Sequence, residues 1–179
     1  ASLNVTAQTG GFTLGASQTL AGGGTVVGDS TVLGTHAPGF SPGEQTFNGD
    51  LAYGAGSSID WELVANTTAG RGVSWDAITV TGDLLFNGAT TLTPNFAASG
   101  STVSFSDTLW SSALGLSGGG WKIFDSGGSV SGLSNLSIGG SLQDSNGTAF
   151  AAARPVMVRL VLMPSAFVAL GTGCRARTV

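Results

Sequence analysis

A Gly-Asp element recurs in three stretches of the sequence: VVGDSTVLGTHAPGF (26–40), FNGDLAYGAGSSIDW (47–61) and VTGDLLFNGATTLTPNF (80–96). The glycines Gly28, Gly49 and Gly82 lie 21 and then 33 residues apart. The longer gap contains an extra segment, ANTTAGRGVSWD (65–76), and removing it restores the shorter period. A period near 21 residues fits one turn of a β-solenoid, whose turns stack and bury a continuous apolar interior.

The residues between the Gly-Asp elements alternate as in half-buried strands. In SSIDWEL, Ile59, Trp61 and Leu63 share one face, and Ser58, Asp60 and Glu62 share the other. The chain has 30 Gly among 179 residues and is rich in Ser and Thr, which disfavours helices. An apolar share of 41% and a mean hydropathy of +0.31 argue against disorder. We therefore predict an all-β solenoid.

Charge and residue composition divide the chain into two parts. All ten acidic residues lie at or before Asp144, whereas four of the six cations, Arg154, Arg159, Arg175 and Arg177, lie near the end. We expect a solenoid body over residues 1–153, with an insertion loop at 65–76, and an apolar and basic segment over 154–179. The net charge of −4 argues against nucleic acid as a partner.

Several stretches resemble known families of exported proteins. TLAGGGTVVGD, APGFSPGEQTFNGDLAYGAGSSIDWEL and SWDAITVTGDLLF resemble the autotransporter-associated β-strand repeat. SFSDTLWSSA, GWKIFDSGGSVSGL and QDSNGTAFAAARP resemble the end of exported bacterial proteins that carry a PEP-CTERM sorting tail. Together the resemblance covers about residues 12–155. It implies a secreted bacterial surface protein without an assigned active site, folded as a right-handed parallel β-helix (β-solenoid) with irregular C-terminal strands.

The last residues depart from the pattern of a sorting tail. VLMPSAFVALGTGCRARTV keeps Pro164, an apolar stretch, Arg175 and Arg177, but it has no Glu between prolines. Segment 154–179 therefore resembles an altered sorting tail. Its apolar part, 156–170, is interrupted by Arg159 and Pro164 and is shorter than the roughly 20 residues that a spanning helix needs, so we expect no stable membrane span.

Few residues suggest catalysis or metal binding. His36 and Cys174 are the single histidine and the single cysteine, so neither a catalytic relay nor an ordinary zinc site is expected. We expect His36 to be structural and predict no cofactor, no metal and no catalytic residue. Trp110 and Trp121 are expected to anchor the core beyond the repeats. The run from Asp144 to Gly147 is expected to form an Asx turn rather than a calcium loop.

A few carboxylates suggest an alternative function. Asp60 and Glu62 share a strand face, and Asp76 follows the insertion that contains Arg71; parallel β-helices host polysaccharide-cleaving enzymes that use such groups. Tyr53, Trp61 and Trp75 could offer an aromatic platform for sugars, although we expect core packing for them. The alternative function is therefore a polysaccharide-binding or lyase-like β-helix protein.

The main prediction is a non-enzymatic, secreted structural protein. Strands at the two ends of a solenoid are templates for further pairing, and here few charged residues are present to prevent that pairing. We expect head-to-tail self-association into an extracellular fibre, surface layer or matrix. The expected partner is thus another copy of the chain, with extracellular polysaccharide as a further possible partner.

Overall fold

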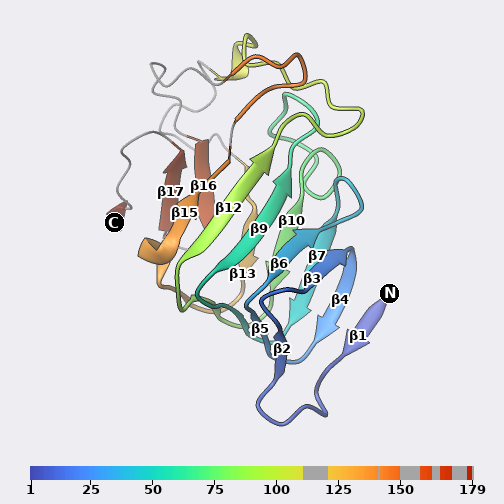
Figure 1. Ribbon diagram of the computed structural model, residues 1–179, viewed down its shortest axis with the longest axis vertical. Helices are drawn as coiled ribbons and strands as arrows, with labels where there is room; N and C mark the ends of the chain where they lie inside the picture. The colour runs from blue at the N-terminus through green and yellow to red at the C-terminus, as the bar shows by residue number, and fades with distance from the viewer. Residues whose placement is uncertain (111–120, 141, 150–157, 163–165, 171–176, 179) are drawn as a thin grey trace.

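The Gly-Asp period corresponds to one coil of a parallel β-helix. The computed structural model describes residues 1–110, 121–140, 142–149, 158–162, 166–170 and 177–178. Fifteen strands form five stacked coils of three strands each (Figure 1). The coils comprise β1 (Ser2–Asn4), β2 (Phe12–Leu14) and β3 (Thr19–Gly22); β4 (Gly24–Val27), β5 (Ser30–Val32) and β6 (Thr35–Pro38); β7 (Glu44–Asn48), β8 (Leu51–Tyr53) and β9 (Ser57–Glu62); β10 (Ala77–Val80), β11 (Leu84–Phe86) and β12 (Thr90–Asn95); and β13 (Phe124–Ser126), β14 (Val130–Ser131) and β15 (Leu136–Ile138).

Equivalent strands of successive coils pair in parallel and form three sheets. Sheet A has the order β1-β4-β7-β10-β13, sheet B the order β2-β5-β8-β11-β14, and sheet C the order β3-β6-β9-β12-β15. The register places Gly28, Gly49 and Gly82 at equivalent positions, because Val27 pairs with Asn48 and Phe47 with Val80. The predicted parallel β-helix and its period are therefore confirmed. The first and fifth coils lack the Gly-Asp element but continue the same ladders.

The alternation seen in the sequence separates the interior from the surface. Ile59, Trp61 and Leu63 are fully buried inside the coils, whereas Asp60 is exposed. Trp110 and Trp121 are also buried, as predicted, and their rings lie 5.2 Å apart between centroids. The apolar interior therefore continues past the repeats.

The Gly-Asp elements form a ladder at the corner between sheets A and B. Asp29 Oδ1 accepts the N–H of Asp50 at 2.9 Å, Asp50 Oδ1 accepts the N–H of Asp83 at 2.8 Å, and Asp83 Oδ1 accepts the N–H of Ser129 at 2.7 Å. Gly49 has φ +152°, and a Cβ there would lie 2.6 Å from the carbonyl carbon of Gly28. Glycine lets the coils approach closely, and aspartate joins each corner to the next.

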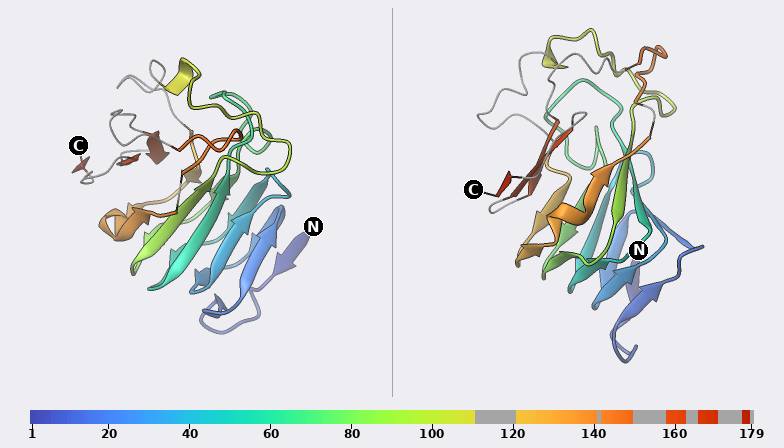
Figure 2. Two further views of the ribbon diagram at one scale, coloured as in Figure 1. Left: turned by 45° about the horizontal axis from the view of Figure 1, so that its top comes forward. Right: turned by 60° about the vertical axis from the view of Figure 1, so that its left-hand side comes forward.

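Long connections collect at one corner of the solenoid. The connections from sheet C to sheet A include residues 39–43, 63–76 and the described parts of 96–123, whereas the turns at the other two corners are shorter, apart from segment 5–11 of the first coil. Figure 2 shows these loops at one end of the strands, beyond the stacked coils. The second of them contains the predicted insertion, which folds back on itself: Val64 N–H donates to Ser74 O and Asp76 N–H to Glu62 O, both at 2.9 Å.

The C-terminal segment forms a separate antiparallel sheet. Strand β17 (Ala166–Leu170) pairs with β16 (Val158–Leu162) and with β18 (Arg177–Thr178), and β16 lies next to β13. This agrees with the predicted irregular C-terminal strands. The expected boundary at residue 153, together with Pro164, Cys174 and Arg175, lies outside the described residues. Within the described part of the chain, no helix is long and apolar enough to cross a membrane.

The corner ladder leads to a first prediction. We expect Asp50→Ala to lower the free energy of unfolding by about 1 kcal/mol, because the N–H of Asp83 loses its acceptor. Asp50→Asn keeps an oxygen at this position and should cost less. Urea denaturation of the two variants beside the parental chain provides the measurement. Equal stability of all three proteins would show that the ladder does not support the coils.

Candidate functional site

A groove on the outer face of sheet C is the candidate site. Its volume is about 690 Å³. The floor consists of outward-facing side chains of β3, β6, β9 and β12. Pro38 at the end of β6, loop residues 39–41 and Asp76 complete the lining. Asp60 and Glu62 of β9 and Asn95 of β12 contribute polar groups, with Asn95 Nδ2 donating to Glu62 Oε1 at 3.4 Å. The structure thus brings together the three carboxylates that the sequence analysis singled out.

Asp76 joins three segments beside this groove. Its Oδ1 accepts the N–H of Gly43 at 2.8 Å, and its Oδ2 accepts the N–H of Glu62 at 2.9 Å. The indole N–H of Trp61 donates to the carbonyl oxygen of Asp76 at 2.7 Å. The side chain is buried, and this burial raises the pKa of Asp76 to about 7. Asp76 therefore connects loop 39–43, strand β9 and the insertion.

Asp60 is the exposed carboxylate of the groove. Partial burial and the neighbouring Glu62 carboxylate raise the pKa of Asp60. Among the described residues, no three His, Cys, Asp or Glu side chains are grouped so that they could hold a metal ion. What the groove offers is therefore a set of hydrogen-bonding oxygens and amides.

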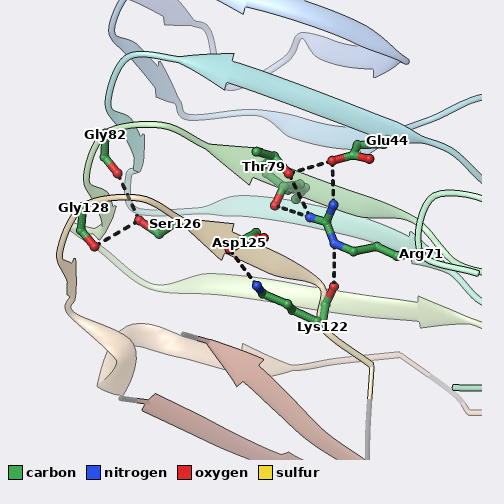
Figure 3. Close-up of polar contacts among 9 residues, drawn as sticks. Glu44, Arg71, Thr79, Gly82, Lys122, Asp125, Ser126 and Gly128 are labelled. Carbon is green, nitrogen blue, oxygen red and sulfur yellow. Dashed lines mark hydrogen bonds and ion pairs between the residues drawn. The ribbon is translucent and has the colours of Figure 1, made fainter. Parts of the chain in front are cut away.

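Arg71 lies on a different face from these carboxylates. Its guanidinium group donates to Glu44 Oε1 at 2.5 Å, to Thr79 Oγ1 at 3.0 Å, and to the carbonyl oxygens of Ile78 and Lys122 (Figure 3). Burial alone would raise the pKa of Glu44, but the hydrogen bonds from Thr79 and Arg71 outweigh it and hold the pKa below its usual value. Arg71 fastens the insertion to sheet A and does not line the groove.

His36 is enclosed in the interior of the solenoid. Its Nε2 lies 2.6 Å from Gln45 Oε1, and its Nδ1 lies 2.6 Å from the hydroxyl of Tyr53. Since the oxygen of Gln45 only accepts, the neutral ring donates from Nε2 and accepts the Tyr53 hydroxyl at Nδ1. Burial lowers the pKa of His36 to about 4, with the hydrogen bond to Gln45 acting in the opposite direction. All three side chains are buried, so the ring meets no solvent.

The aromatic residues named from the sequence do not form a platform. Tyr53, Trp61 and Trp75 are all buried, which confirms the core interpretation. Among the residues whose burial the structure describes, the exposed aromatic residue is Phe40, which is 86% exposed at the rim of the groove. Phe40 was not predicted as a site residue from the sequence, although its position between Gly39 and Ser41-Pro42 marks a turn.

Asp144 forms the predicted Asx turn. Its Oδ1 accepts the N–H groups of Asn146 and Thr148, both at 2.9 Å, and its Oδ2 accepts the N–H of Phe105 at 3.0 Å. These backbone donors, that of Phe105 foremost, lower the pKa of Asp144. Asp144 therefore fastens the turn at 144–148 to the long connection that contains Phe105.

Comparison with known proteins finds no relative of this chain. No family model, no curated protein and no solved structure matches this chain.

Two of the buried titratable groups, His36 and Asp76, act on stability in opposite directions. The unfolded chain protonates His36 below about pH 6.5 and the folded chain below about pH 4, so this group destabilises the fold as the pH falls between these values. At complete burial, the effect is on the order of 3 kcal/mol. The folded chain protonates Asp76 below about pH 7 and the unfolded chain below 3.8, so this group stabilises the fold as the pH falls.

We predict that Asp76→Asn removes the opposing contribution of Asp76, so that the pH dependence of stability due to His36 becomes measurable. The free energy of unfolding of this variant should fall more steeply than that of the parental chain as the pH decreases from 6.5 to 4. Denaturation at several pH values measures both slopes. Parallel profiles for variant and parent would show that Asp76 does not titrate in this range.

Proposed function

We propose that the chain is a non-enzymatic structural protein that associates head to tail through the ends of its solenoid. The supporting observation is the open edge of the first coil. Strands β1, β2 and β3 are the terminal strands of sheets A, B and C. A terminal strand leaves half of its backbone N–H and C=O groups unpaired and so favours pairing with another strand.

The backbone of β2 shows which groups are available. Phe12 donates its N–H to Asp29 O, and Leu14 O accepts the N–H of Leu33, each at 2.9 Å, so both residues face the second coil. Backbone groups of successive strand residues point to opposite edges, so those of Thr13 point away from the second coil. On neighbouring β1, Leu3 is 45% exposed and adds apolar surface to this end.

The fifth coil offers the matching end. Strands β13, β14 and β15 terminate the same three sheets on the opposite side, and all pairs between coils are parallel. The first coil of one copy can therefore extend sheets B and C of another copy without a change in direction, whereas β16 lies next to β13 at the end of sheet A. The aspartate ladder does not extend across this contact. Thr6 occupies the place of the aspartate in the first coil, and its N–H already donates to Asn4 Oδ1 at 3.0 Å.

The positions of the reactive side chains support a structural role. His36 is buried between Tyr53 and Gln45, and Arg71 is held by Glu44, Thr79 and two backbone carbonyls. Asp76 uses both carboxylate oxygens to accept backbone N–H groups. Each of these residues stabilises the coils or their loops.

The resemblance to autotransporter repeats and PEP-CTERM proteins supports a secreted location on the bacterial surface. Antibody labelling of intact source cells tests this part of the proposal. Labelling without permeabilisation is expected, and labelling only after permeabilisation would contradict it.

A proline at the open edge tests self-association. Thr13→Pro removes the outward N–H of β2 but none of the bonds from Phe12 and Leu14 to the second coil. We expect the parental chain to form larger species with rising concentration in sedimentation velocity, and Thr13→Pro to shift this assembly to higher concentration. Thr13→Ala, which keeps the N–H, is the matched control and should behave like the parent.

Circular dichroism checks that both variants keep the parental fold. The parental chain sedimenting only as a monomer over a wide concentration range would contradict the proposal. Unchanged assembly of a folded Thr13→Pro variant would exclude the edge of the first coil as the contact.

A further inference from the structure

The groove on sheet C is elongated along the solenoid axis. The register places Ala21 beside Ala37 and Asp60 beside Thr93, and it continues from Ala37 to Asp60 through the pairing of His36 with Ile59. One row of the floor therefore crosses four coils. Neighbouring strands lie about 4.8 Å apart, so this row is about 14 Å long. A groove of this shape suits a linear ligand.

Phe40 forms an apolar wall of the groove. The ring is 86% exposed, and a Cβ on Gly22 would lie 3.1 Å from its Cζ, so the ring stands over the small residues of β3. Ala21 and Ala37, which have short side chains, form the groove floor beside the ring. An exposed aromatic face beside a shallow apolar floor suits a flat ligand with apolar ring faces, such as a pyranose.

The polar groups of the groove complement hydroxyl groups. Asp60 and Glu62 accept hydrogen bonds, whereas Thr93 and Asn95 both donate and accept them. No Lys or Arg is found among the described residues that line the groove. A chain with carboxylate or sulfate groups would be repelled by these acids, so the charge favours a glycan without anionic groups.

The floor does not suit an extended peptide. Peptides that bind sheets use the unpaired backbone groups of an edge strand. Here β6 and β9 are interior strands of sheet C and already pair with neighbours on both sides. Recognition in the groove therefore rests on side chains.

We propose that this groove binds a linear, non-anionic glycan chain, with Phe40 stacking on a sugar ring and Asp60 and Glu62 accepting its hydroxyl groups. The groove includes Ala21 of the terminal strand β3, but it uses outward-facing side chains, whereas self-association uses the backbone edge of the first coil. Loss of glycan binding and loss of assembly are therefore separate results.

Isothermal titration tests this site with defined probes. The neutral probes are cellohexaose, mannohexaose and N-acetylated chitohexaose; hexagalacturonate and hexalysine represent an anionic glycan and a basic peptide. We expect at least one neutral hexasaccharide to bind, and Phe40→Ala and Asp60→Ala each to weaken its binding by about tenfold or more. Hexagalacturonate should not bind.

Val73→Ala provides the matched control. Val73 is also an exposed apolar residue, 73% exposed, but it belongs to the insertion and does not line the groove. Its substitution should leave glycan affinity unchanged. Absence of binding to all three neutral chains, full affinity of Phe40→Ala, or stronger binding of hexagalacturonate or hexalysine would each overturn the proposal.

Discussion

The parallel backbone ladder between coils is the constraint on which the rest of the structure depends. It repeats the same register from the first coil to the fifth, and the Gly-Asp corner keeps that register where the chain turns. Every other feature follows from this stacking. Side chains at equivalent positions form rows, inward rows become the core, and outward rows become continuous surfaces along the axis.

The same stacking explains why the three long connections lie together. Each leaves sheet C and enters sheet A, so insertions of different length emerge at the same corner. Asp76 and Arg71 then fasten the insertion in two directions, Asp76 to loop 39–43 and β9, and Arg71 to sheet A. The groove lies where residues 38–41 adjoin the outward-facing side chains of sheet C. Scaffold and candidate site therefore have a common origin in the register.

The sequence predicted the coils that carry Gly-Asp and the inward face of Ile59, Trp61 and Leu63, because period and alternation are local patterns. It did not predict the first and fifth coils as equivalents, since Thr6 and Ser129 occupy the places of the aspartates there. The groove could not be predicted from the sequence for a different reason. Phe40 and Asp76 are far apart in sequence, and they line the same groove because Asp76 binds the N–H of Gly43 in loop 39–43, a contact that no local pattern encodes. Asp60, Glu62 and Asp76 were noticed as carboxylates, but their common groove depends on how the insertion folds back.

In the proposed assembly, the open edge of the first coil pairs with another copy of the chain. Amide hydrogen exchange at Thr13, followed by NMR over a range of protein concentrations, tests it most directly, because this N–H points away from the chain's own second coil. Thr31, its partner in sheet B, is an internal reference that should remain protected throughout. We expect Thr13 to exchange rapidly in dilute protein and to become protected as the protein concentration rises. Rapid exchange of Thr13 at every concentration, even while the protein assembles, would contradict it.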